Sequence, residues 1–488
     1  MSCEQSPKSL LSKKNRSDGV HITPELQKEE KEAVDNRKTQ VVMSLNKLGI
    51  KADEAPVLAV LGSGGGLRAH FACLGVLIEM KNHGLLDVIT YLAGVSGSTW
   101  ALSSFYTNSG NMEHIEADLE HRFELENWSI WESLQKTIEA ASLENYSLTD
   151  FWAYIVVSRQ TREFQGSLLS SMKKHVEKGT LPYPIFAAID NDLHPGWKDQ
   201  KTQKSWFEFT PHHAGYPALK SYIPITQFGS QFENGRLVKS ALERDLSFLR
   251  GLWGSAVANT EENKKFIWDE FLSLKEKLLG KHQLTQVTIS DILAFLAKTA
   301  KCIWNWEWGT IHNFLHQHHG SNVCITDEDM CSRKLLHLVD AGLAINSPYP
   351  LLLPPAREVQ LILSFDFSDG DPFETVRATA DYCHHHKIPF PLVKEADLKE
   401  WAEAPTSCYI LKGESGPVVM HFPLFNKDNC GDDINTWRDK YGTFKLSDTY
   451  SVQLVKDLLE KSKENVRKNK EKIIRTIKEV VGSCPETS

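Results

Sequence analysis

The chain has 488 residues, of which 41% are hydrophobic and 24% are charged, so it is long enough to bury a substantial core. Its formal net charge of −8 argues against broad electrostatic attraction to nucleic acid or to an anionic membrane. No stretch approaches 18 consecutive apolar residues, and the first residues lack the apolar segment of a signal peptide. We therefore expect neither a membrane span nor secretion. The nine cysteines are scattered, with neither a C-x-x-C pair nor the spacing of a disulfide framework.

The first chemical element is a glycine loop between an apolar run and a helix start. Residues 55–61 predict a buried strand, which is followed by Gly62-Ser-Gly-Gly-Gly66. Backbone N–H groups of such a loop, next to a helix N-terminus, can bind an oxyanion or a phosphate. Nucleotide binding fits poorly, because no Gly-Lys-Ser/Thr follows and Leu67 stands where a dinucleotide fingerprint has its third glycine. Gly65 and Gly66 are instead candidate donors of an oxyanion hole.

The second element presents a hydroxyl between two glycines. Residues 88–93 predict another buried strand, which runs into Gly94-Val-Ser-Gly-Ser98. A nucleophilic serine is presented in this way at a sharp strand-to-helix turn, where side chains beside it would obstruct packing. Ser98 replaces the last glycine of the full G-x-S-x-G motif, so an ordinary Gly/Ser turn is the alternative for Ser96.

The third element is Asp340, which follows an apolar strand predicted at residues 336–339 and precedes a glycine turn. The carboxyl ends of strands are where α/β sheets hold their chemistry. The alternative is that Asp340 only caps the turn.

Residues 105–330 lie between these elements and are expected to supply cap or lid material. Within them, residues 181–190 predict a further core strand, residues 206–213 an aromatic loop, and residues 261–284 a surface helix or mobile lid. Trp304, Trp306 and Trp308 alternate as on a strand, where core packing is favoured over contact with lipid.

Near the end of the chain, residues 451–481 predict a helix with many lysines and arginines among apolar residues. Such a helix could dock on a membrane surface. Interspersed acidic residues favour a solvated helix that packs on its own domain.

Together the three elements resemble the catalytic domain of the cytosolic, group IV phospholipases A2, a branch of the patatin-like lipases. The shared motifs are Gly-Ser-Gly-Gly-Gly-x-Arg, Gly-x-Ser-Gly-Ser-Thr-Trp and Asp-x-Gly-Leu, followed by residues 346–353 with Arg357 and by residues 363–368. The resemblance extends from roughly residue 20 to beyond residue 450 and is strongest to the gamma form.

This resemblance implies an α/β fold: a patatin-like three-layer α/β/α catalytic domain with a mixed central sheet and a cap. We expect one catalytic domain over residues 21–482, with flexible segments at residues 1–20 and 483–488. It implies no calcium-binding membrane domain.

Carried over by position, the resemblance makes Ser96 the nucleophile, Asp340 its partner, and Gly65 and Gly66 the oxyanion donors. Arg68 and Arg357 become ligands of the substrate phosphate, a role that suits a guanidinium. A carboxylate of ordinary pKa is a weak base for an alcohol. We therefore expect Asp340 to be desolvated, with a raised pKa, within reach of Ser96.

Two alternatives from the residues stay open. A Ser-His-Asp esterase of non-phospholipid substrates would need a later histidine, for which the candidates are His384, His385, His386 and His421. The chain could also be a catalytically silent lipid-binding or scaffold protein. A zinc site is not favoured at the histidine-rich patch, because no Glu accompanies its members in an H-E-x-x-H arrangement; these are His312, His316, His318 and His319.

The expected activity is calcium-independent hydrolysis of the sn-2 ester of glycerophospholipids, through an acyl-enzyme that also permits lysophospholipase and transacylase reactions. No cofactor and no metal are expected, because attack by Ser96 needs none. The expected partners are phospholipid and lysophospholipid substrates and a transient membrane surface, with no nucleic acid. We expect a cytoplasmic protein with peripheral association to intracellular membranes.

Overall fold

The computed structural model describes residues 19–125, 128–193, 201–256, 261–280, 287–318, 328–442 and 449–482. Residues 1–18 and 483–488 lie outside this range, and with them most of the flexible segments expected at residues 1–20 and 483–488. The last two residues of the first segment are described, and they are held: Gly19 forms a β-bridge with Arg236, and the amide of Val20 donates to the Gly235 carbonyl.

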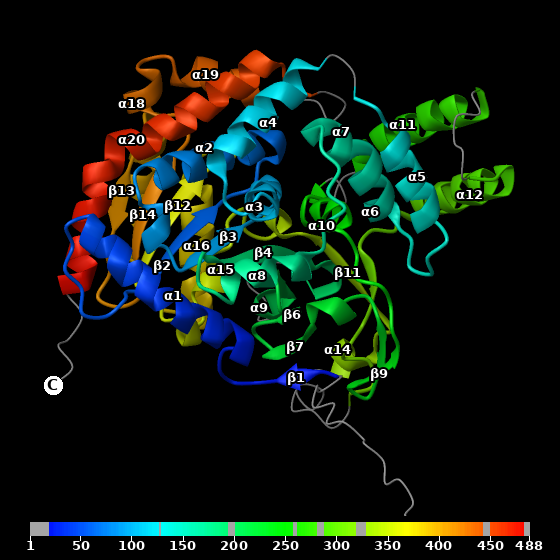
Figure 1. Ribbon diagram of the computed structural model, residues 1–488, viewed down its shortest axis with the longest axis horizontal. Coiled ribbons are helices and arrows are strands. Elements are labelled where there is room, and N and C mark those ends of the chain that lie inside the picture. The colour runs from blue at the N-terminus through cyan, green and yellow to red at the C-terminus, as the bar shows by residue number, and fades with distance from the viewer. Residues whose placement is uncertain are drawn as a thin grey trace, which may run out of the picture.

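A mixed sheet of twelve strands runs through the molecule (Figure 1). Its main path has the order β1-β7-β6-β5-β4-β3-β2-β12-β14-β13, while β11 pairs with β4 and β10 pairs with β11. The strands are β1 His21–Ile22, β2 Leu58–Gly62, β3 Tyr91–Gly94, β4 Tyr183–Asp190, β5 Trp206–Phe209, β6 His213–Tyr216, β7 Ser221–Pro224, β10 Thr310–His312, β11 Leu335–Asp340, β12 Leu361–Asp366, β13 Tyr409–Leu411 and β14 Val418–Pro423. The strands from β4 to β14 along the path are parallel, and the other pairs are antiparallel.

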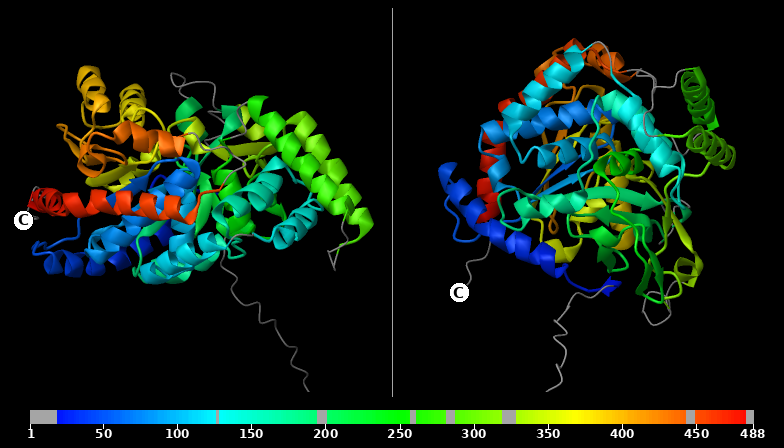
Figure 2. Two further views of the ribbon diagram at one scale, coloured as in Figure 1. Left: turned by 90° about the horizontal axis from the view of Figure 1, so that it is seen from above. Right: turned by 45° about the vertical axis from the view of Figure 1, so that its right-hand side comes forward.

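The parallel strands are continuous apolar runs because helices cover the sheet on both sides. Every residue of β2, β3 and β12 is buried, as expected for strands without a solvent face. Figure 2 shows helices from the N-terminal part of the chain on one side of the sheet and those of residues 374–403 on the other. The main helices are α1 Lys28–Lys47, α2 Gly66–Asn82, α3 Gly97–Thr107, α4 Met112–Glu124, α5 Trp131–Ala140, α10 Leu246–Trp253, α11 Glu261–Gly280, α12 Ile289–Asn305, α16 Glu374–His386, α17 Glu395–Glu403, α19 Ile434–Gly442 and α20 Val452–Gly482.

The C-terminal helix α20 packs along α2, the helix that begins at the glycine loop. A Cβ added at Gly75 would lie 2.0 Å from Ser462 Oγ and 2.8 Å from the Leu459 carbonyl, so the two helices meet at close range. The prediction that this helix packs on its own domain is confirmed. Among the described residues, no helix combines the length and apolar character needed to cross a bilayer.

The region expected to form the cap follows the sequence prediction in part. The predicted helix at residues 261–284 is α11, whose described part ends at Gly280. The prediction of an aromatic loop at residues 206–213 is wrong. Strands β5 and β6 pair there as antiparallel strands, because their aromatic residues fill the core.

The predicted strand through the three tryptophans is also wrong. Trp304 is helical in α12, and Trp306 ends that helix in the left-handed conformation. Trp308 is buried, whereas Trp304 is 88% exposed. Cysteines 73, 302, 383, 408 and 430 are free thiols, but Cys331 is disulfide-bonded, contrary to the expectation from spacing.

Candidate active site

Ser96 lies in the sharp turn between β3 and α3. Its φ of 51° and ψ of −122° are unusual for a residue with a side chain, and such strain persists only where the surroundings hold it. The hydroxyl of Thr99 donates to the Ser96 carbonyl at 2.5 Å, and that of Ser98 donates to the Ser63 carbonyl at 2.6 Å. The turn is therefore fixed to its own helix and to the glycine loop, as in a nucleophile elbow.

The elbow and the glycine loop are in direct contact. A Cβ at Gly97 would lie only 1.9 Å from the Gly66 carbonyl, so no other residue fits there. A Cβ at Gly64 would lie 3.0 Å from the Cβ of Ser96. The loop thus passes directly beside the predicted nucleophile.

Gly65 and Gly66 have positive φ angles of 151° and 58°, which a side chain would disfavour. Within the described part of the chain, their amides donate to no other group. The neighbouring Gly64 is held by Asn346, whose carbonyl accepts from the Gly64 amide at 3.0 Å and whose side-chain amide donates back at 3.1 Å. Two amides next to Ser96 are therefore available to an oxyanion.

The register of the sheet explains how Asp340 reaches Ser96. On one edge of β4, Gly94 at the end of β3 faces Phe186, and Asp340 at the end of β11 faces Ala188. The opposite edge of β4 is taken by β5. Strands β3 and β11 therefore run toward each other along the same side of β4. Their last residues lie opposite positions of β4 that are two residues apart, which corresponds to about 7 Å.

The Asp340 side chain is fully buried, and burial raises the pKa of its carboxyl to about 6. Oδ1 accepts from the Gly342 amide at 2.7 Å, and the Ala256 amide also lowers the pKa of this carboxyl. The Ser96 hydroxyl also lies close enough to this carboxyl to lower its pKa. Within the described part of the chain, Oδ2 is buried and has no hydrogen bond of ordinary geometry.

Arg68 lies in the first turn of α2, next to the loop. Its Nε donates to the Phe367 carbonyl at 2.7 Å and its Nη1 to the Tyr441 carbonyl at 3.0 Å. A Cβ at Gly65 would lie 3.1 Å from Nη2, which places the remaining N–H groups of the guanidinium beside the oxyanion loop. Arg68 is therefore in position to meet an anion there.

Arg357, by contrast, is not brought to this site. Arg357 precedes β12, whose first residue pairs with the first residue of β2. It therefore lies where the parallel strands begin, whereas Ser96 lies where they end. Nε and Nη2 bind Glu30 at 2.8 and 3.1 Å, Nη1 and Nη2 bind Glu208 at 2.8 and 2.9 Å, and Nη1 also donates to the Leu351 carbonyl. All five N–H groups are used, so the structure does not support a phosphate-binding role for Arg357.

The histidine candidates for a triad are not near Asp340. Both ring nitrogens of His421 are engaged, with Ser364 Oγ at 3.2 Å and the Pro372 carbonyl at 2.6 Å, and burial lowers its pKa to about 4. Among the described residues, no histidine influences the pKa of Asp340. The remaining three candidates, His384, His385 and His386, form the last turn of α16.

The histidine-rich patch is not helical: His312 is in β10, and His316 and His318 lie in the turn after it, while His319 lies outside the described residues. Over the part of the chain that the structure describes, no three acidic, histidine or cysteine side chains are placed to hold a metal ion.

Sequence reasoning gave no role to three positions that support the site. Asn346 joins the glycine loop to the segment after Asp340, and the Ala256 amide reaches the carboxyl from a distant loop. Asp366, at the end of β12, is buried beside Arg68, and burial raises the pKa of its carboxyl to about 7. Asn346 and Asp366 fall within the shared motifs, but nothing in the sequence indicated Ala256.

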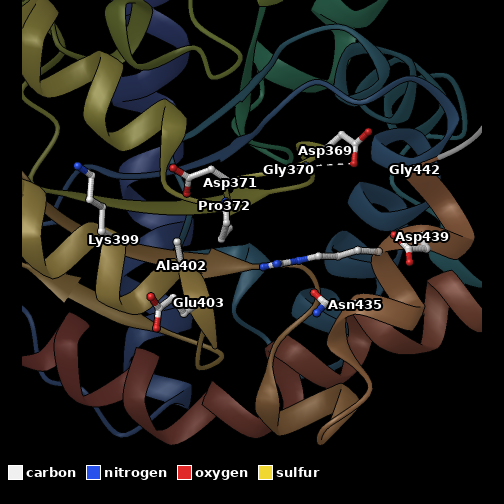
Figure 3. A pocket seen from close by; sticks show the side chains of 11 residues that line it. Asp369, Gly370, Asp371, Pro372, Lys399, Ala402, Glu403, Asn435, Asp439 and Gly442 are labelled. Atoms are coloured by element: carbon white, nitrogen blue, oxygen red, sulfur yellow. Dashed lines mark hydrogen bonds between the residues drawn. The ribbon is translucent and has the colours of Figure 1, made fainter.

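A pocket of about 760 Å³ is lined by residues 369–372, which follow β12, and by residues of α17 and α19. Figure 3 shows Asp369, Asp371, Lys399, Glu403 and Asp439 along its wall. None of Ser96, Asp340, Gly65 and Gly66 lines it, so it is separate from the predicted chemistry.

A serine on a strained strand-to-helix elbow, beside a buried carboxyl and two open glycine amides, is the arrangement typical of hydrolases with a serine nucleophile. Comparison with known proteins narrows this class. The family described as "Lysophospholipase catalytic domain" matches residues 58–386. Cytosolic phospholipase A2 gamma from Homo sapiens is 56% identical over 529 residues, covering 96% of this chain and 97% of that protein. The Mus musculus gamma protein is 54% identical, covering 96% and 93%.

The solved structure of human GIVD cytosolic phospholipase A2 has the same fold, with a TM-score of 0.72 at 22% identity over 95% of this chain and 68% of that one. The chain belongs to the cytosolic phospholipase A2 family and is a phospholipase A2/lysophospholipase-type hydrolase.

Proposed function

We propose that this protein is a calcium-independent phospholipase A2, which hydrolyses the sn-2 ester of glycerophospholipids with Ser96 and Asp340 as its catalytic pair. The observation that carries the proposal is the buried carboxyl of Asp340, which the hydroxyl of Ser96 approaches from a strained elbow and whose Oδ2 has no hydrogen bond of ordinary geometry among the described residues. Because burial raises the pKa of Asp340 to about 6, this carboxylate is a stronger base than an exposed aspartate and is still ionised at neutral pH.

In the first step, the Ser96 hydroxyl transfers its proton to Asp340 as its oxygen attacks the ester carbonyl. The amides of Gly65 and Gly66 donate to the oxyanion that forms. Collapse of this intermediate breaks the bond to the glycerol oxygen, and Asp340 returns the proton to the departing lysophospholipid. The product on the protein is an acyl-serine.

In the second step, water attacks the acyl-serine, and Asp340 takes and returns a proton in the same way. The fatty acid leaves and Ser96 is regenerated. An alcohol or a lysophospholipid in place of water would give transacylation, and a lysophospholipid as the first substrate would give lysophospholipase activity. These activities share one intermediate, so they are part of the same proposal.

Arg68 is proposed to bind the phosphate of the substrate. Its unused N–H groups lie beside Gly65, so the phosphodiester can meet the guanidinium while the neighbouring ester lies at the amides. The mechanism needs neither metal nor cofactor. A protein of this kind acts at membrane surfaces, and we propose that it is cytoplasmic and associates peripherally with intracellular membranes.

The test is hydrolysis of phosphatidylcholine labelled separately at sn-1 and sn-2, with EGTA present. We expect sn-2 release by the wild type, and a loss of at least about 1,000-fold in kcat for Ser96→Ala and for Asp340→Asn. Ser415→Ala and Asp432→Asn, which change exposed residues of the same types, serve as matched controls.

Labelling by methyl gamma-linolenyl fluorophosphonate, which is bound in a structure of the GIVD protein, gives a second readout. It should modify the wild type but not Ser96→Ala. Loss of activity on chelation, or retained activity in both active-site variants, would contradict the proposal.

A further inference from the structure

Helices α11 and α12 form an antiparallel pair that projects from one side of the molecule (Figures 1 and 2). Each helix buries one apolar stripe. On α11 the stripe consists of Ile267, Phe271, Leu274 and Leu278, and on α12 of Ile292, Phe295, Leu296 and Ile303. These stripes account for the packing of the pair on itself and on the body.

Each helix also carries a second apolar stripe whose side chains remain exposed in the described structure. On α11 it consists of Trp268, Leu272 and Leu279, which lie within about 40° of one another at 100° per residue. On α12 it consists of Ile289, Leu293 and Trp304, within about 60°. These six side chains are between 37% and 88% exposed. We call them the hairpin apolar surface.

The geometry of the pair turns both stripes the same way. The exposed stripe is rotated from the buried stripe in the same sense on both helices, by about 110° on α11 and about 95° on α12. When two antiparallel helices with this pattern pack through their buried stripes, a twofold axis perpendicular to the plane of the pair relates one helix to the other. The two exposed stripes therefore face the same side of the hairpin, and six large apolar side chains gather on one surface.

Both ends of the hairpin are attached close to the candidate active site. Five residues before α11, the amide of Ala256 acts on the Asp340 carboxyl, which places the start of α11 within about 18 Å of it. After α12, the Gly309 carbonyl accepts from the amide of Leu338, two residues before Asp340.

Further contacts fix the orientation of the hairpin on the body. Arg159 binds the two carboxylate oxygens of Glu270 on α11 at 2.9 and 3.0 Å. The amide of Gly309 donates to Thr149 Oγ1 at 2.8 Å. The hairpin apolar surface is thus held in a set position with respect to Ser96.

We propose that the hairpin apolar surface docks this protein on the surface of a zwitterionic lipid bilayer, so that the active site at its base takes substrate from the membrane. The proposal rests on the proposed function, since it assumes that the substrate is a membrane phospholipid.

The charges of the hairpin favour a zwitterionic bilayer over an anionic one. Helices α11 and α12 together contain six Lys and six Asp or Glu, so their formal charges cancel. A surface without net charge gains nothing from anionic lipid or from a charged protein partner. Its binding energy must come from apolar side chains, among which tryptophan suits the boundary between headgroups and acyl chains.

The experiment measures co-sedimentation with phosphatidylcholine vesicles, in the Ser96→Ala background so that the lipid is not hydrolysed. The test variant carries Leu272→Gln, Leu293→Gln and Trp304→Gln. The matched control carries Met43→Gln and Leu392→Gln, two exposed apolar residues on other parts of the surface. Thermal unfolding of both variants checks that they are folded.

We expect the triple substitution to weaken vesicle binding at least tenfold and the control to leave it unchanged. Binding of the parent protein should vary by less than twofold between 50 and 500 mM NaCl, about the range over which charge-driven binding is lost. With Ser96 present, the triple variant should need about tenfold more vesicles for half-maximal rate. Its kcat/KM on a short-chain phosphatidylcholine, dispersed as monomers, should match that of the wild type.

Vesicle binding unaffected by the triple substitution would overturn the proposal. So would a dimer in solution that the triple substitution dissociates, because a second copy would then cover the surface. If the wild type hydrolyses the monomeric substrate but does not bind vesicles, this inference fails while the proposed function stands. If it binds vesicles through the hairpin but hydrolyses neither substrate, the proposed function fails and the docking surface stands.

Discussion

At Asp340, burial raises the pKa of the carboxyl from an ordinary 3.8 to about 6. The direction follows from desolvation, which disfavours the charged form, while the Ser96 hydroxyl and two amides offset part of the effect. The carboxyl must be ionised to accept the Ser96 proton. Protonation at low pH therefore removes the base, and ionisation as the pH rises restores it.

We predict that kcat/KM rises as the pH increases through about 6 and is level above about 7. The measurement is a pH–rate profile on a monomeric substrate, at two temperatures. Ionisation of a carboxyl has a small enthalpy and that of an imidazole a large one, so the midpoint should barely move with temperature. A midpoint that falls markedly on warming would indicate a histidine base and contradict the Ser–Asp pair.

At the scale of elements, the strand-to-helix elbow and the glycine loop act as one unit. The contact at Gly97 joins them, because a Cβ there would overlap the Gly66 carbonyl. Backbone atoms cannot move aside as a flexible side chain can. The distance between Ser96 and the amides of Gly65 and Gly66 therefore depends on this position lacking a side chain.

Gly97→Ala should lower kcat by at least about 100-fold, because a small displacement of the nucleophile from the oxyanion donors is costly. It should also destabilise the fold by about 1–3 kcal/mol through overpacking. Activity assays and urea unfolding measure the two effects. Gly280→Ala is the matched control, since among the described residues no atom outside its own helix backbone lies within 4 Å of its added Cβ. Unchanged activity in Gly97→Ala would mean that the elbow does not set the catalytic geometry.

At the scale of the whole molecule, Arg357 joins parts of the chain that are far apart in sequence. Its ion pairs span 327 residues to Glu30 on α1 and 149 residues to Glu208 on β5. Removing one member of a buried ionic group leaves the others unpaired, which costs about 3–5 kcal/mol. Lysine cannot replace the five donors of this arginine.

Arg357→Lys should therefore unfold at a lower urea concentration, while KM for phospholipid relative to a phosphate-free ester stays the same. Arg68→Lys should instead raise the KM for the phospholipid alone, because a lysine cannot bind the Phe367 and Tyr441 carbonyls and the phosphate at once. Unfolding curves and the two KM values distinguish these cases. A selective rise in KM for phospholipid in Arg357→Lys would return Arg357 to a role in phosphate binding.

The family, the α/β class and the candidate chemistry around Ser96, Gly65 and Asp340 could be predicted from the amino-acid sequence. This is possible because each of these residues lies where a continuous apolar strand ends in glycines or a turn, a local pattern set by backbone geometry. The helix at residues 261–280 and the packing of the C-terminal helix also followed from local periodicity and charge.

Features that depend on pairing between distant segments became visible only in the folded chain. The antiparallel β11 brings Asp340 to the end of β3, and Ala256 reaches Asp340 from another loop. Arg357 is enclosed by two carboxylates at the other end of the parallel strands, where they begin. The strand predicted through the three tryptophans is absent, because alternation over five residues does not distinguish a strand from the end of a helix. Which apolar residues are left uncovered depends on how whole helices pack, so the exposure of Trp304 and its neighbours on α11 and α12 could be seen only in the folded chain.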